Sequence, residues 1–187
     1  KCDACGAWNS IAEETPREAA PRGLGKAKGR AIPFVNLDGK HGEVARHASG
    51  IAELDRTVGG GLVAGSSVLL AGDPGIGKST LLLQAAGALA ANGVSCAYIS
   101  GEEGVAQIRL RAARLGLIDR PVRLAAATNV RDILAGLESA ALADIVIVDS
   151  IQTMYLDSLD SAPGTVSQVR GAAQELIRHA KRSGSVL

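Results

Sequence analysis

The feature that most constrains this sequence is a glycine-rich octapeptide, GDPGIGKS, at residues 72–79. It matches the pattern GxxxxGK[ST] without a mismatch. The apolar run at 67–71 before it predicts a buried strand, and apolar residues at helical spacing after it predict a helix that begins near Lys78. Glycines let backbone N–H groups close around phosphate oxygens, and a helix N-terminus favours the same anion. The pattern therefore predicts a phosphate-binding loop between a strand and a helix.

Two side chains of this loop predict what it binds. Lys78 would reach the β- and γ-phosphates of ATP, and the Ser79 hydroxyl would ligate Mg²⁺. A glycine-rich turn without a ligand is the alternative interpretation. The residues predicted to contact the nucleotide are Gly72, Asp73, Pro74, Gly75, Ile76, Gly77, Lys78, Ser79 and Thr80.

Apolar runs typical of strands alternate with stretches of helical periodicity through the rest of the chain. The run Ile-Val-Ile-Val at 145–148 is the strongest strand signal, because β-branched residues favour extended backbone. Strands are expected at 96–100, 121–124 and 145–148, and helices at 105–115, 130–141 and 165–182. The alternation predicts an α/β fold, in which helices flank a parallel sheet and ligands bind at the carboxyl ends of its strands.

Acidic residues follow two of the expected strands. Asp149 closes the strand of β-branched residues, where its carboxylate would hold Mg²⁺ through water; a turn or helix cap is the alternative. Glu102 would activate the water that attacks the γ-phosphate, whereas Glu103 would complement the dipole of the next helix. Gln152 would contact the γ-phosphate or belong to a plain loop. The predicted catalytic residues are Lys78, Glu102 and Asp149.

The first 31 residues lack the apolar periodicity of the rest. Residues 1–11 contain a CxxC pair, Cys2 and Cys5, which is half of a zinc site, a redox pair or neither. Residues 12–31 are rich in glycine, proline, alanine and charge, which predicts a flexible linker. The globular domain is expected over 32–187.

Composition excludes some classes of protein. Twenty basic and 19 acidic residues give a net charge of +1, which rules out a uniformly basic surface for nucleic acid. No run approaches the roughly 20 apolar residues that a membrane-spanning helix needs. Three cysteines, two of them in one CxxC, do not form a disulfide framework and favour a reducing compartment, so a cytoplasmic protein is expected.

Six blocks of the sequence resemble one known family. They read SGIAELDR at 49–56, GGGLVAGS at 59–66, GDPGIGKST at 72–80, SGEE at 100–103, VDSIQTM at 148–154 and APGTVSQVR at 162–170. Together they are similar to the bacterial RadA (Sms) family of RecA-like P-loop ATPases, and the similarity covers essentially the whole chain.

The resemblance implies a fold, an activity and partners. It implies a RecA-like ATPase domain at 32–187, in which residues 185–187 begin a strand between the 67–71 strand and the Asp149 strand. It implies a DNA-dependent ATPase that binds single-stranded DNA and promotes branch migration of recombination intermediates during repair. It also implies a hexameric ring of identical subunits and a RecA-type recombinase as partner.

The same resemblance implies an N-terminal zinc finger of four cysteines. Cys2 and Cys5 match its second pair. Two thiolates cannot complete a tetrahedral Zn²⁺ site, so the site is incomplete in this chain, which we treat as a fragment.

Basic residues that could contact DNA lie in two places. Residues 16–50 carry seven basic and three acidic side chains, so they form either a tethered arm for phosphates or a solubilising linker. The segment 154–164 occupies the place of a DNA-binding loop in RecA-like proteins, but it has no lysine or arginine. Better candidates on the helix that follows are Arg170, Arg178, Lys181 and Arg182.

Two other functions fit a phosphate-binding loop. A P-loop kinase would pass the phosphoryl group to a small molecule, and a nucleotide-dependent scaffold would bind ATP without hydrolysing it.

Overall fold

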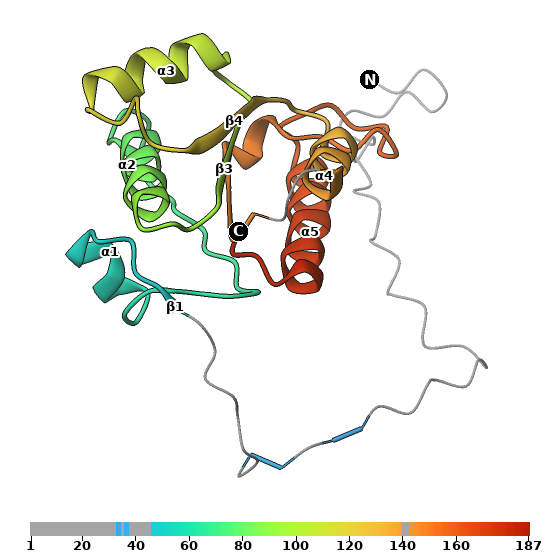
Figure 1. Cartoon of the computed structure of the whole chain (residues 1–187). Helices are drawn as coiled ribbons and strands as arrows, with labels where there is room; N and C mark the ends of the chain where they lie inside the picture. Colours follow the sequence, from blue (N-terminus) through green and yellow to red (C-terminus); the bar gives the residue numbers. More distant parts are fainter. Residues whose placement is uncertain (1–32, 35, 38–45, 140–142) are drawn as a thin grey trace, which may run out of the picture. The chain divides into compact units, whose positions relative to one another are not determined.

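A computed structural model describes residues 33–34, 36–37, 46–139 and 143–187 of the chain (Figure 1). The chain divides into two compact units, Lys1–Lys40 and His41–Leu187, and the fold described below is that of the second unit. The zinc-finger half at 1–11 with Cys2 and Cys5, and the linker at 12–31, lie outside the described residues.

A parallel sheet forms the centre of the second unit. Its strands are β3 (Cys96–Ser100), β4 (Val122–Ala126) and β5 (Ile145–Asp149), in the order β4-β3-β5. Every residue of the central strand β3 is buried. Ser100 pairs with Ala126 on one side and with Asp149 on the other, so the carboxyl ends of the three strands are level.

Helices cover both faces of this sheet. Figure 1 shows α2 (Lys78–Ala91) and α3 (Val105–Arg114) on one face, and α4 (Val130–Ser139) and α5 (Val166–Ser183) on the other. Side chains alternate along β3 accordingly: Tyr98 packs in a core with α2 and α3, and Ala97 packs in a second core with α4 and α5. The predicted α/β fold is therefore confirmed.

Short elements precede and follow these layers. Along the chain, α1 (Ala52–Thr57) comes between β1 (Arg46–His47) and β2 (Leu62–Val63), and all three precede the strands of the sheet. β1 and β2 pair with each other in antiparallel. After β5, a 3₁₀ turn, η1 (Ile151–Thr153), leads toward α5. Among the described residues, none of the helices combines the length and apolar character that crossing a bilayer requires.

The last residues of the chain extend the sheet beyond β5. Val186 bridges to Ile145 in parallel. On its other side, the Val68 N–H donates to the Leu187 carbonyl oxygen at 2.8 Å, and the Leu187 N–H donates to the Ser66 carbonyl oxygen at 3.0 Å. This donor pattern is that of parallel strands. The expectation that 185–187 lie between the Asp149 strand and the segment before the loop is confirmed.

The expectation of a buried strand at 67–71 is wrong. The segment has no regular strand structure, and Val68 and Leu69 are 45% and 80% exposed. An apolar run becomes a strand only when a neighbouring backbone pairs with it and a second layer covers it. Among the described residues, the backbone hydrogen bonds to Leu187 engage only Ser66 and Val68, so only the first part of the segment is paired.

The close contact between η1 and the turn that follows β3 requires glycine at position 101. A Cβ on Gly101 would overlap Thr153 Oγ1 and lie 2.9 Å from Thr153 Cβ. We therefore expect Gly101→Ala to lower the free energy of unfolding by about 2 kcal/mol, because η1 must move away from the sheet. The measurement is the unfolding midpoint of this domain in differential scanning calorimetry.

Gly136→Ala is the matched control. Gly136 lies on α4, and a Cβ there would meet no atom within 4 Å. Alanine at this position should leave the domain unchanged or stabilise it by at most about 1 kcal/mol, because alanine is the better helix former. Equal midpoints for the two variants would contradict the packing role of Gly101.

Candidate active site

The glycine-rich loop leads directly into α2, which begins at Lys78 as the sequence predicts. Gly75 and Gly77 have φ angles of 79° and 105°. A Cβ at either position would meet no atom within 4 Å, so glycine is needed there for the left-handed backbone and not for space. The loop is exposed.

The Lys78 side chain lies across the loop. Its Nζ donates to the carbonyl oxygens of Gly72 at 2.7 Å and Asp73 at 2.8 Å. No side chain caps the start of α2, and its first turn carries no acidic residue. The N–H groups at this helix end are therefore open to an anion.

The loop and the acidic residues share one edge of the sheet. Segment 66–68 runs parallel to 186–187, which run parallel to β5, so the loop leaves the sheet at the edge where Asp149 ends β5. The Gly101 N–H donates to the Asp149 carbonyl oxygen at 2.9 Å, which joins the ends of β3 and β5. The peptide bond that follows Asp149 is cis.

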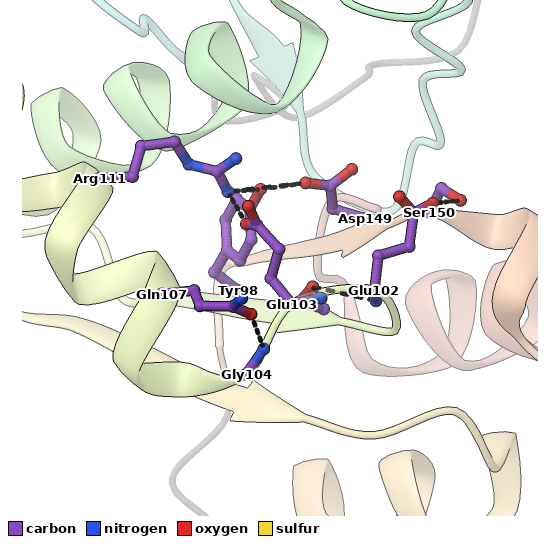
Figure 2. A network of polar contacts seen from close by, with 9 residues as sticks. Tyr98, Glu102, Glu103, Gly104, Gln107, Arg111, Asp149 and Ser150 are labelled. Atoms are coloured by element: carbon purple, nitrogen blue, oxygen red, sulfur yellow. Dashed lines mark hydrogen bonds and ion pairs between the residues drawn. The ribbon is translucent and has the colours of Figure 1, made fainter.

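Glu102 lies beside the residue that follows Asp149 (Figure 2). The Ser150 hydroxyl donates to Glu102 Oε1 at 2.7 Å. The Ser100 hydroxyl oxygen accepts the N–H groups of Glu102 at 3.3 Å and Glu103 at 2.9 Å, which shapes the turn after β3. Glu102, predicted to act on water, follows β3, and Asp149, predicted to bind metal, ends the neighbouring strand β5.

Glu103 directly precedes the N-cap of α3, Gly104, and its role toward the helix dipole stays a prediction. Its carboxylate also pairs with Arg111 Nη2 at 2.7 Å. The start of α3 is capped by Gln107, whose Oε1 accepts the Gly104 N–H at 3.0 Å.

Two residues of the site were not identified from the sequence. The Tyr98 hydroxyl donates to Asp149 Oδ2, and Arg111 Nη2 lies 3.4 Å from the Tyr98 oxygen and 4.0 Å from Asp149 Oδ2 (Figure 2). Burial, the hydrogen bond to Asp149 and the charge of that carboxylate raise the pKa of Tyr98 far above its ordinary value, so the hydroxyl stays protonated. The signal in the sequence is Tyr98 itself, whose hydroxyl needs a hydrogen-bond partner within the apolar strand at 96–100.

The donor set fits a magnesium nucleotide. Ser79 lies in the first turn of α2, where its hydroxyl makes no hydrogen bond within the described part of the chain, and Asp149 supplies a carboxylate at the same edge. Mg²⁺ in nucleotide sites takes one or two protein oxygens and fills its other positions with water and phosphate. Gln152 lies exposed on η1, where its role stays a prediction.

The segment 154–164 is held by one side chain of α5. The two N–H groups of Gln168 Nε2 are shared among the carbonyl oxygens of Leu156, Leu159 and Ser161, and Gln168 Oε1 accepts the Leu156 N–H at 2.8 Å. Gln168 is itself buried, so these four bonds satisfy it.

Several charged residues near that segment are already paired. Arg131 pairs with Asp157 at 2.9 Å, which lowers the pKa of Asp157. The α5 residues proposed for DNA divide into two groups. Arg178 and Arg182 form ion pairs with acidic residues at 2.8 Å, and Arg170 and Lys181 have no ion pair among the described residues.

Comparison with known proteins identifies the family. A family model described as "AAA domain" matches residues 39–185. DNA repair protein RadA of Brucella abortus (strain 2308) is 53% identical over 195 residues, which cover 100% of this chain and 42% of that protein. The RadA proteins of Rickettsia bellii and Pseudomonas aeruginosa are 45% and 44% identical, again over 100% of this chain and 41% of their own length. The chain thus spans about two-fifths of these relatives.

Solved structures share the fold at lower sequence identity. A KaiC-like protein from the hyperthermophilic archaeon Pyrococcus horikoshii has a TM-score of 0.62 at 22% identity, with 77% of this chain and 70% of that one covered. A DnaB-like replicative helicase has a TM-score of 0.63 at 20% identity, with 78% and 42% covered. The RecA-like P-loop fold expected from the sequence is confirmed. This chain therefore belongs to the AAA domain family, and DNA repair proteins named RadA are similar to it over its full length.

Proposed function

We propose that this chain is the ATPase domain of a DNA repair protein that hydrolyses ATP while it acts on single-stranded DNA. One observation carries the proposal. The glycine-rich loop with Lys78 leaves the sheet at the same edge where Asp149 ends β5 and Glu102 follows the end of the neighbouring strand β3. A loop that binds phosphate and a pair of carboxylates at one edge can hold a nucleotide and act on water.

The role of each residue follows from its position. Lys78 would exchange the carbonyl oxygens of Gly72 and Asp73 for phosphate oxygens. Ser79 and Asp149 would hold Mg²⁺, which neutralises charge on the phosphates when bound. Glu102 would accept the proton of the attacking water, and the Ser150 hydroxyl would hold the Glu102 carboxylate in place.

The action on DNA rests on the relatives. They are named for DNA repair, and one structure with the same fold is a DnaB-like replicative helicase. Branch migration, a hexameric ring, a RecA-type recombinase as partner, a Zn²⁺ finger in the longer protein and a cytoplasmic location stay predictions. Arg170 and Lys181 are the α5 cations that we propose for DNA phosphates, because no ion pair among the described residues engages them.

One assay tests the proposal. Phosphate release from ATP by the full-length protein is measured in Mg²⁺, with and without single-stranded DNA, and Lys78→Ala serves as the control for contaminating activity. We expect hydrolysis that rises several-fold with DNA, and we expect added salt to weaken this stimulation because phosphate contacts are screened.

Two other outcomes would replace the proposal. Phosphoryl transfer to a small acceptor, with no response to DNA, would indicate a kinase; the acceptor could enter the cavity of about 290 Å³ that lies between the ends of β3 and β4 beside Glu102. Tight ATP binding with no phosphate release would indicate a scaffold.

A further inference from the structure

Two side chains surround the Asp149 carboxylate: Tyr98 from β3 and Arg111 from α3 (Figure 2). We propose that Tyr98 and Arg111 are positioning residues, which hold Asp149 in the orientation that binds the Mg²⁺ of the nucleotide. This inference rests on the proposed function. It makes the magnesium requirement depend on residues that would touch neither nucleotide nor metal.

The sheet register brings Tyr98 to Asp149. Tyr98 pairs with Ile147, two residues before Asp149, and side chains two residues apart on a strand share a face. Tyr98 and Ile147 both pack in the core that faces α2 and α3. Asp149 therefore projects to the face where the tyrosine ring lies.

The tyrosine is held rigidly. It has no solvent exposure, and its ring packs in a core with Leu83 and Ile108. A hydroxyl on an immobile ring fixes the carboxylate that accepts its hydrogen bond. The Tyr98 hydroxyl bonds Asp149 Oδ2, and Oδ1 has no hydrogen bond among the described residues, so Oδ1 would be available to a water bound to Mg²⁺.

Arg111 adds a charge that two carboxylates share. Its Nη2 lies 2.7 Å from Glu103 and 4.0 Å from Asp149, and its side chain is only 14% exposed. A cation this close would lower the attraction of Asp149 for Mg²⁺ if it were not neutralised. Glu103 supplies that neutralising charge, so Arg111 can restrain Asp149 without cancelling the negative charge that the metal needs.

The test compares two tyrosine variants in the full-length protein. Tyr98→Phe keeps the ring and removes the hydroxyl. Tyr155→Phe is the matched control, since Tyr155 is the other of the two tyrosines in the chain and its hydroxyl has no hydrogen bond among the described residues. Binding of a fluorescent ATP analogue is measured in EDTA and then across a Mg²⁺ titration, which does not depend on hydrolysis.

We expect Tyr98→Phe to raise the half-saturating Mg²⁺ concentration about tenfold, with nucleotide affinity in EDTA unchanged. Arg111→Lys should raise it less, because lysine keeps a positive charge near the two carboxylates that Arg111 Nη2 approaches. Tyr155→Phe should match the wild type in both measurements.

The results separate the two proposals. The positioning role is overturned if the magnesium requirement of Tyr98→Phe equals that of Tyr155→Phe, or if affinity in EDTA falls by the same factor as affinity in Mg²⁺. In the latter case Tyr98 supports the fold of the whole site. A wild-type protein that binds magnesium nucleotide but releases no phosphate would refute the proposed hydrolysis and leave the positioning result intact.

Discussion

Replacing Lys78 by alanine in the full-length protein is expected to reduce ATP hydrolysis by at least about 100-fold. The reason is the position of its ammonium group, which lies across the loop at 2.7 Å and 2.8 Å from the carbonyl oxygens of Gly72 and Asp73. A triphosphate in this loop would lose the cation that offsets its charge. The measurements are the phosphate-release rate and the affinity for a fluorescent ATP analogue.

Lys78→Arg makes the test more specific. Arginine keeps the charge, but its planar guanidinium differs in shape from an ammonium group. We expect Lys78→Arg to retain part of the nucleotide affinity that Lys78→Ala loses, with hydrolysis still strongly reduced. Thermal unfolding without nucleotide controls for damage to the loop, because Lys78 also bonds its backbone. Turnover by Lys78→Ala within about twofold of the wild-type rate would remove the central assignment.

Local sequence signals were sufficient for the parts of the fold that local chemistry determines. The start of α2 at Lys78, the end of β5 at Asp149 and the parallel sheet all follow from glycine spacing and apolar periodicity. Segment 67–71 shows the limit of this reasoning. Its composition is that of a buried strand. Whether it forms one depends on other parts of the molecule, which must hydrogen-bond its backbone and pack over its side chains. In the described structure, most of the segment has neither kind of contact.

The contacts of the site depended on information that the sequence pattern does not contain. Glu102 and Glu103 are adjacent and chemically identical, yet one accepts a hydrogen bond from Ser150 and the other pairs with Arg111. Backbone direction after Ser100 decides which carboxylate faces which neighbour. The contact between Tyr98 and Asp149 required the strand register, which pattern analysis of single strands does not give.

Replacing Glu102 by glutamine should leave ATP binding intact and slow hydrolysis by about 100-fold to 10,000-fold. The Ser150 hydroxyl donates to Glu102 Oε1 at 2.7 Å, and the amide oxygen of glutamine can accept the same hydrogen bond. The substitution therefore preserves the position of the side chain and removes its ability to take a proton from water. Phosphate release in a single turnover and nucleotide affinity in Mg²⁺ measure the two effects separately.

Glu53→Gln is the control for the loss of one negative charge. Glu53 lies exposed on α1, and within the described part of the chain its one ion pair is with Arg56, also exposed, so its replacement should change neither quantity. If Glu102→Gln weakens nucleotide affinity as much as it slows hydrolysis, Glu102 shapes the site and does not act on water. If Glu102→Gln changes neither hydrolysis nor nucleotide affinity, the proton acceptor is another group at this edge of the sheet. Asp149 and Glu103 are the other carboxylates there, and they contact Tyr98 and Arg111. A selective loss of turnover is the result that only a proton acceptor at position 102 explains.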